Sequence, residues 1–276
     1  MIKSPSAHIQ RLIVIKTQAA PQNKSLIKNT EEEKMGKVIV VTSGKGGVGK
    51  TTATANIGSA LAAQGHSVLL LDADIGLRNL DLLLGLENRI VFDIVDVLEG
   101  RCRLKQAVVK DKRNEKLCLL PASQTREKNA VNEEQMKELL LELKAAYDYV
   151  MIDCPAGIEQ GFKNAIAGAD EAIVVCTPEV ASIRDADKVI GLLGVSDVLK
   201  TSLVVNRMKE DMVKRGDMLG VEDIEDILGV KTIGIIPEDE LVVRAANLGE
   251  PVVNIFKSGS GIAYCEIARR IAGEAL

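Results

Sequence analysis

The order of apolar runs along the chain limits its fold more than any other feature. From residue 37 onward, short runs rich in Val, Ile and Leu alternate with longer stretches of helical periodicity. The apolar runs show little polar alternation, which is typical of strands buried on both faces. The predicted strands are Val38–Thr42, Val68–Asp72, Leu117–Pro121, Tyr149–Asp153, Ala172–Thr177, Ser202–Asn206 and Thr232–Pro237. The predicted helices are Thr51–Gln64, Glu133–Ala146, Ile183–Leu193, Val221–Leu228, Glu240–Asn247 and Ile262–Ala272.

This rhythm predicts an α/β fold: a doubly wound, mostly parallel sheet with helices on both faces. Because crossovers between parallel strands are right-handed, the carboxyl ends of the strands share one edge of the sheet. Ligands of such folds bind at that edge. Polar residues follow the first, second, fourth, sixth and seventh predicted strands. We therefore expect the functional site there.

Composition excludes several classes of protein. The 276 residues carry a net charge of -4, and aromatic residues make up only 2%. Neither a strongly basic nucleic-acid binder nor an aromatic platform for stacked bases has this composition. The five cysteines include no C-x-x-C pair, so we expect free thiols rather than a zinc site or a disulfide framework.

The N-terminal segment differs from the rest. Residues 1–30 contain five basic residues and no acidic one. We expect residues 1–35 to form a basic, disordered extension, either a transit segment for an organelle or a plain leader. The folded domain is predicted for residues 36–276. No apolar run reaches the roughly 18 residues needed to span a membrane.

One glycine-rich segment carries a specific chemical signal. Gly44–Thr51 matches G-x-x-x-x-G-K-[ST] in full, between a predicted strand and a predicted helix. Glycines let the backbone point several N–H groups at one anion, and the helix dipole reinforces them. Lys50 can reach β- and γ-phosphate oxygens, and the Thr51 hydroxyl can ligate Mg²⁺. The expected nucleotide-binding residues of this loop are Gly46, Gly47, Val48, Gly49, Lys50, Thr51 and Thr52.

Three aspartates follow predicted strands. Asp153 ends an apolar strand, where an aspartate holds Mg²⁺ directly or through water; a turn-capping role before Pro155 is the alternative. Asp72 and Asp74 are two residues apart, so in an extended chain they point to the same side. We expect both to face the γ-phosphate, with a turn or N-cap role for one of them as the alternative.

The segment Lys45–Thr52 resembles the deviant Walker A motif of the ParA/MinD family, within the SIMIBI class of ATPases. The chain is most similar to the MinD branch of that family, in its cyanobacterial or plastid form, over about residues 36–272. The segments that carry this likeness are Asp72–Glu87, Asp153–Glu159, Pro178–Val180, Arg184–Asp187 and Ile236–Asp239. The resemblance implies a P-loop ATPase domain that binds ATP or ADP with Mg²⁺ and hydrolyses ATP to ADP and phosphate.

The resemblance also assigns roles. Lys50 contacts the phosphates of its own nucleotide, whereas Lys45 matches the signature lysine that crosses an ATP-bound homodimer to the partner's phosphates. Thr51 ligates the metal, Asp74 orients the attacking water at the metal site, and Asp153 supports the metal. Asn206, Pro237 and Glu238 match the purine-binding residues.

The family implies partners as well. Arg184, Asp185 and Asp187 match the surface where a MinC-like inhibitor and a MinE-like activator dock, although a charged helix is as often a solvated face. The implied function is an ATP-dependent switch that places the division septum of a cell or plastid. Family members end in an amphipathic Lys- and Phe-rich helix, and none follows the last predicted helix before Leu276. We expect a location in the cytoplasm or plastid stroma, with inner-membrane attachment only where such a tail is present.

Two alternatives compete with this interpretation. A ParA-type DNA partition ATPase usually carries Asp-x-Asp-Pro-Gln-Gly, where this chain has Asp-Ala-Asp-Ile-Gly-Leu from Asp72 onward. The acidic domain also lacks the basic stripe that binding to phosphate backbones requires, so we expect no specific nucleic acid. An electron-transfer or cluster-carrying protein would need paired cysteines for a bridging cluster, and no cysteine fits that pattern.

Overall fold

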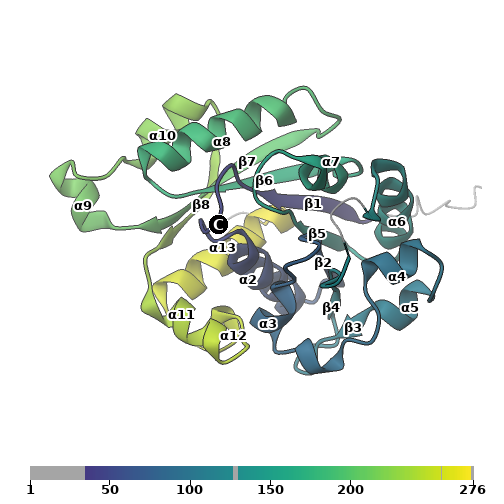
Figure 1. Ribbon diagram of the computed structural model, residues 1–276. Coiled ribbons are helices and arrows are strands. Elements are labelled where there is room, and N and C mark those ends of the chain that lie inside the picture. Colours follow the sequence, from purple (N-terminus) through teal and green to yellow (C-terminus); the bar gives the residue numbers. More distant parts are fainter. Residues whose placement is uncertain (1–34, 127–129, 256, 275–276) are drawn as a thin grey trace, which may run out of the picture. The chain divides into compact units, whose positions relative to one another are not determined.

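Eight strands form one sheet at the centre of the folded unit, which begins at Met35 (Figure 1). The computed structural model describes residues 35–126, 130–255 and 257–274. The extension predicted for residues 1–35 lies, apart from Met35, outside the described residues. In these ranges no helix has the length and apolar content that crossing a bilayer demands.

The sheet is parallel except at one edge. Its order is β3-β4-β2-β5-β1-β6-β7-β8, and only β3 runs antiparallel to its neighbour. The strands are β1 (Lys37–Thr42), β2 (Val68–Asp72), β3 (Val109–Lys110), β4 (Leu117–Leu120), β5 (Tyr149–Asp153), β6 (Glu171–Cys176), β7 (Lys200–Met208) and β8 (Thr232–Pro237). The central strands β1 and β2 are almost wholly buried, as their unbroken apolar sequences predict.

Helices cover both faces of the sheet, and successive residues of β1 point into two separate cores. Val38 and Val40 face one core, and Ile39 and Val41 face the other. The helices of the first core are α4 (Ile94–Leu98), α5 (Leu104–Ala107), α6 (Glu133–Ala146), α7 (Gln160–Ile166), α8 (Val180–Leu193), α9 (Glu210–Arg215) and α10 (Val221–Leu228). Those of the second core are α2 (Lys50–Ala63), α3 (Leu80–Leu84), α11 (Glu240–Asn247), α12 (Val252–Ile255) and α13 (Gly259–Ala272), with the 3-10 turn η2 (Glu87–Arg89) beside them.

The predicted α/β architecture is confirmed. All seven predicted strands and all six predicted helices are present, with ends that differ by a few residues. The elements that the sequence did not reveal are short: β3 has two residues, η2 has three, and the helices α3, α4, α5, α7, α9 and α12 have four to seven each. Segments of that length span at most about two helical turns, so they carry little readable periodicity.

Candidate functional site

The loop between β1 and α2 is shaped to hold an anion. Gly47 and Gly49 adopt left-handed backbone angles, with φ of 79° and 102°. These angles are readily accessible only to glycine, and they let successive N–H groups turn inward. Helix α2 then begins at Lys50, which is only 8% exposed, and no side chain caps the helix N-terminus. The free N–H groups and the helix dipole therefore point at the same place as the loop.

Two glycines of the loop pack tightly against distant parts of the chain. A Cβ atom on Gly44 would overlap the carbonyl group of Asp185 on α8. A Cβ atom on Gly49 would overlap the carboxamide nitrogen of Asn206, which donates to the Val48 carbonyl oxygen at 2.8 Å. The loop is thus fixed from α8 on one side and from β7 on the other.

Asp153, at the end of β5, is buried beneath this loop. Its Oδ1 atom has no hydrogen-bond partner among the described residues, while the Thr51 hydroxyl and Lys50 lie near enough to the carboxyl group to lower its pKa. Burial, followed by repulsion from Asp72, raises the pKa of Asp153 to about 8. A buried carboxylate with an unpaired oxygen beside a threonine hydroxyl is a donor set that suits Mg²⁺.

Asp72 takes the turn role that the sequence left open as the alternative for one of the two aspartates. Its carboxylate accepts backbone N–H groups from Asp74 at 3.0 Å, Asn79 at 3.1 Å and Leu80 at 3.2 Å. It is 1% exposed, and burial raises its pKa to about 6. Of the two roles that the sequence left open for Asp72, these bonds support the turn role, because Asp72 holds the loop that leads into α3. Asp74 is half-buried and close enough to Asp72 and Asp153 to raise both of their pKa values.

Lys45 has a neighbour within its own chain. Its Nζ atom lies 3.8 Å from Glu179 Oε2, just before α8, and the two side chains are 47% and 64% exposed. No local pattern in the sequence predicts this contact, because Glu179 lies more than 130 residues further along the chain. An ion pair so exposed contributes little to stability, so Lys45 can leave Glu179 at small cost.

A pocket of about 370 Å³ lies at the carboxyl ends of β7 and β8. It brings together three residues that the sequence predicted for purine binding, Asn206, Pro237 and Glu238. Gly49 and Thr52 of the loop line the same pocket, so it is continuous with the anion site. Its far wall comes from α11 and is largely apolar, as a flat heterocycle requires.

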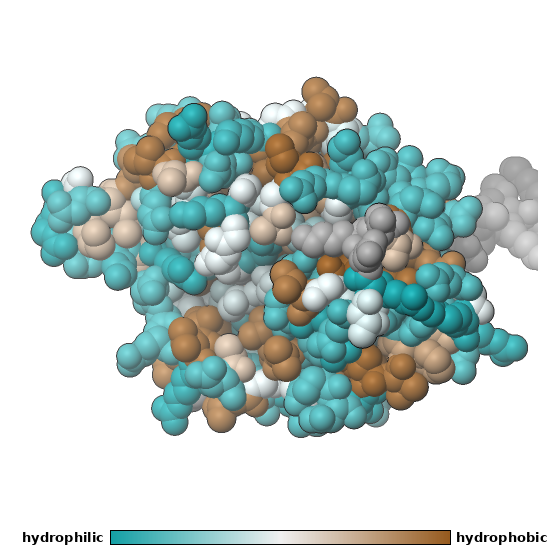
Figure 2. Space-filling model, viewed as in Figure 1, coloured by the Kyte–Doolittle hydropathy of each residue, from teal (hydrophilic) through white to brown (hydrophobic). Residues whose placement is uncertain are grey.

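The three predicted partner-binding residues lie on α8. Arg184 and Asp187 are exposed, whereas Asp185 is half-buried, with its carbonyl group against Gly44 and its carboxylate near Lys188 Nζ at 3.2 Å. Two of the three are therefore accessible to a partner. Figure 2 shows the face seen in Figure 1 to be mostly hydrophilic, with hydrophobic residues in separate patches.

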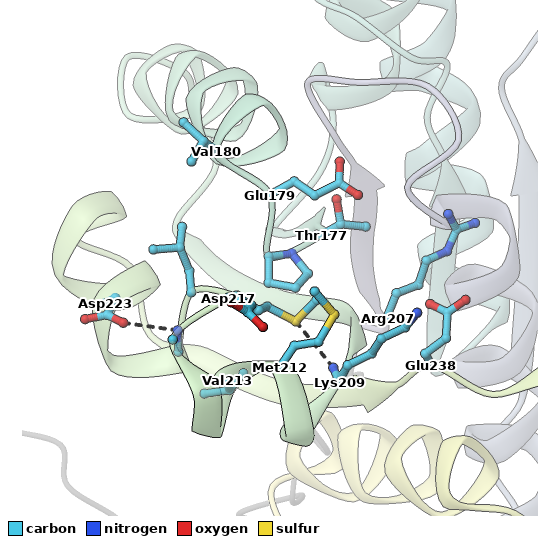
Figure 3. Close-up of a pocket in the computed structure, with 15 residues that line it drawn as sticks. Thr177, Glu179, Val180, Arg207, Lys209, Met212, Val213, Asp217, Asp223 and Glu238 are labelled. Carbon is cyan, nitrogen blue, oxygen red and sulfur yellow. Dashed lines mark hydrogen bonds between the residues drawn. The ribbon is translucent and has the colours of Figure 1, made fainter.

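A second, larger cavity of about 760 Å³ opens beside the first. Figure 3 shows Thr177 and Glu179 on one side of it, Met212 and Val213 on another, and Arg207 with Glu238 at one end. Sequence analysis did not predict this cavity, because its lining residues are spread between Thr177 and Glu238.

A parallel sheet with an anion-binding loop after β1 and a buried carboxylate after β5 defines a P-loop nucleoside triphosphatase. A family model described as an AAA domain matches residues 36–203. With the relatives given below, this match shows that the chain belongs to the MinD family of septum site-determining ATPases.

Relatives resemble this chain over almost their whole length. Septum site-determining protein MinD of Synechocystis is 57% identical over 241 residues, which are 87% of this chain and 91% of the relative. A putative MinD protein of Guillardia theta is 56% identical over 242 residues, 87% of this chain and 90% of its own.

Solved structures support the same family assignment. The Aquifex aeolicus MinC:MinD cell division protein complex contains a chain 55% identical, with a TM-score of 0.82 over 87% of this chain and 97% of that one. The Pyrococcus horikoshii MinD complexed with Mg-ADP is 30% identical, with a TM-score of 0.79. The match covers 86% of this chain and 96% of that chain. A ParA family ATPase from Chlorobium tepidum shares the fold at 24% identity. The ParA alternative is therefore not favoured.

Proposed function

We propose that this chain is an ATP-driven dimerisation switch that helps to place the division septum. The phosphates of ATP fit the loop between β1 and α2, where inward N–H groups and the buried Lys50 supply positive charge. The purine fits the 370 Å³ pocket, because Gly49 and Thr52 join that pocket to the loop. Bound Mg²⁺ would neutralise charge on the phosphate oxygens, and Thr51 with Asp153 would hold it.

Hydrolysis on this arrangement needs a positioned water. Asp74 stands after β2, near the buried Asp153 and exposed enough to reach solvent. We assign Asp74 to accept a hydrogen bond from the water that attacks the γ-phosphorus, while the bond from that phosphorus to the β-phosphate bridging oxygen breaks. Lys50 stabilises the charge that develops on the leaving ADP oxygens.

The contrast between the two lysines of the loop supports the dimer. Lys50 is 8% exposed inside the cradle, whereas Lys45 is 47% exposed and has only the weak contact with Glu179. A second copy facing this site could therefore receive Lys45 at its own phosphates. Such a contact is two-fold symmetric, because each chain gives one lysine and takes one. Dimerisation would then require the γ-phosphate.

Size-exclusion chromatography tests this proposal directly. We expect wild type to elute as a monomer with ADP and as a dimer with ATP. Asp74→Ala should form a long-lived ATP dimer, and Lys45→Ala should stay monomeric with ATP while still binding ADP. A mixture of the two variants should regain partial hydrolysis, since one site of a mixed dimer keeps Asp74 and receives Lys45. Normal hydrolysis by Lys45→Ala would contradict the cross-dimer role.

For partners, we propose a MinC-like inhibitor and a MinE-like activator on α8. The support is the exposure of Arg184 and Asp187 and the MinC:MinD complex of a relative with 55% identity. Arg184→Ala should weaken binding of a MinC-like protein in a pull-down with ATP, and the matched exposed substitution Glu142→Ala on α6 should not. Equal binding by both variants would move the docking surface away from α8.

We place the protein in the cytoplasm or the plastid stroma, with peripheral attachment to the inner membrane where the native chain carries an amphipathic tail. Imaging of a fluorescent fusion of the native chain tests this location. A diffuse nuclear or extracellular signal would contradict it.

A further inference from the structure

Two arginines of this chain adopt a backbone conformation that arginine rarely takes. Among the described residues other than glycine, only Arg78 and Arg207 have positive φ angles, 33° and 60°. A non-glycine residue held in this region is strained, and such residues gather at functional sites. Each of the two therefore requires an explanation.

Contacts within the chain explain Arg78 but not Arg207. Arg78 Nε lies 2.8 Å from Asp81 Oδ2, and the two side chains are only 15% and 1% exposed. Arg207 is exposed, and its side chain forms neither an ion pair nor a hydrogen bond with any described residue. Folding alone thus gives no contact that offsets the strain at Arg207.

The strain at Arg207 arises from a bulge between β7 and β8. Val205 pairs with Ile235 and Met208 pairs with Pro237, so Asn206 and Arg207 together oppose the single residue Ile236. The Asn206 carboxamide oxygen accepts the Arg207 backbone N–H at 3.0 Å, and its nitrogen donates to the Val48 carbonyl oxygen. Asn206 therefore fixes the direction of Arg207 relative to the phosphate loop.

The bulge places the Arg207 side chain at the boundary between the two cavities. Among the described residues, only Arg207 and Glu238 line both the 370 Å³ pocket and the 760 Å³ cavity (Figure 3). The opposite wall of the smaller pocket is apolar, with Val242, Val243 and Ala246 of α11. The pocket is thus lined both by apolar side chains of α11 and by Arg207, whose side chain has no ion pair or hydrogen bond among the described residues.

We propose that Arg207 is a further nucleotide-binding residue, whose guanidinium stacks on the face of the purine and closes the pocket. The proposal rests on the proposed function, because it requires the base to occupy the 370 Å³ pocket. A guanidinium is planar, weakly hydrated and always charged, so it stacks on an aromatic face as an ammonium group does not. The left-handed backbone is then retained because nucleotide binding uses it.

Calorimetry with two ligands tests the proposal. Mg-ADP carries phosphates and a base, whereas inorganic tripolyphosphate with Mg²⁺ carries phosphates alone. We expect Arg207→Ala to raise the Kd of Mg-ADP about 3- to 30-fold and to leave tripolyphosphate within about two-fold. Lys209→Ala is the matched control, since Lys209 lines only the larger cavity and should leave both affinities unchanged. Arg207→Lys should weaken Mg-ADP binding by nearly as much as Arg207→Ala.

A second variant separates stacking from damage to the fold. Arg207→Gly removes the guanidinium but relieves the left-handed backbone, so its unfolding midpoint should exceed that of Arg207→Ala. Its Mg-ADP affinity should still fall to the level of Arg207→Ala. Unchanged Mg-ADP affinity in the Arg207 variants, or an equal loss for tripolyphosphate, would overturn the stacking role. Failure of wild type to bind Mg-ADP would instead overturn the proposed function together with it.

Discussion

The phosphate side and the base side of the site are built in different ways. The phosphate side uses one continuous loop after β1 and single carboxylates after β2 and β5, all in regular parallel register. The base side uses a bulge in β7, the end of β8 and residues of α11 and α13. The first depends on local sequence, the second on how distant segments pair. The two sides meet where Asn206 bonds Val48.

The largest effect should come from Asp74, on the phosphate side. Asp74→Ala removes the group that orients the attacking water, so we expect ATP hydrolysis to fall about 10²- to 10⁴-fold. The Kd of Mg-ADP should stay within about two-fold, because both the loop and the base pocket remain. A phosphate-release assay and calorimetry measure the two quantities. Hydrolysis at the wild-type rate would make Asp74 a structural residue.

The next largest effect should come from Lys50→Ala, which should weaken phosphate binding and leave base binding unchanged. The β- and γ-phosphates would lose their buried cation, and we expect the affinity for Mg-ATP to fall by at least about 100-fold. Adenosine, which uses only the base side, should bind wild type and variant equally. Equilibrium dialysis with both ligands provides the comparison, and an unchanged Mg-ATP affinity would rule out phosphate binding by this loop.

The same difference decides what the sequence could predict. Gly44–Thr51 is a contiguous motif between a strand and a helix, so both the loop and the position of Asp153 could be placed from local signals. The bulge at Arg207 could not, because it depends on the register between β7 and β8, which no local pattern encodes. The sequence left two roles open for Asp72 for a related reason: whether a carboxylate caps a turn or faces a ligand depends on where the N–H groups of Asn79 and Leu80 lie.

The stability contributed by the two sides should also depend differently on pH. In the absence of Mg²⁺ and nucleotide, burial raises the pKa of Asp153 to about 8, above the 3.8 of an unperturbed aspartate. From about pH 4 to pH 8 the folded state then holds a proton that the unfolded chain releases, so the free energy of unfolding falls as pH rises. In the Asp153→Asn variant, the free energy of unfolding should fall much less between pH 5 and pH 8.5 than it does in wild type. Urea titrations at pH 5, 7 and 8.5 measure this difference.

Asp239, on the base side, supplies the control. Burial alone would raise its pKa, but hydrogen bonds from Ser260 and Leu241 outweigh burial and lower it. The stability that ionised Asp239 contributes is fully present above the pKa of Asp239 in the unfolded chain. It is lost as pH falls through the lower pKa of Asp239 in the folded protein. Asp239→Asn should therefore destabilise the protein equally at pH 5, 7 and 8.5. A pH-independent Asp153→Asn difference over that range would contradict the assignment on the phosphate side.

The smallest expected effect concerns a part of the phosphate side that the sequence did not reveal, the contact between Gly44 and α8. A methyl group at Gly44 would overlap the Asp185 carbonyl, so Gly44→Ala should lower the free energy of unfolding by about 1–3 kcal/mol. Gly191 is the matched position: it lies within α8, has no atom within 4 Å of an added Cβ and does not need a positive φ. Gly191→Ala should raise the free energy of unfolding by up to about 1 kcal/mol, because alanine favours the helix. Urea unfolding of both variants measures the difference. If both substitutions raise the free energy of unfolding, Gly44 does not pack tightly against α8. The conformation of the phosphate loop would then depend on its own contiguous motif and not on distant segments.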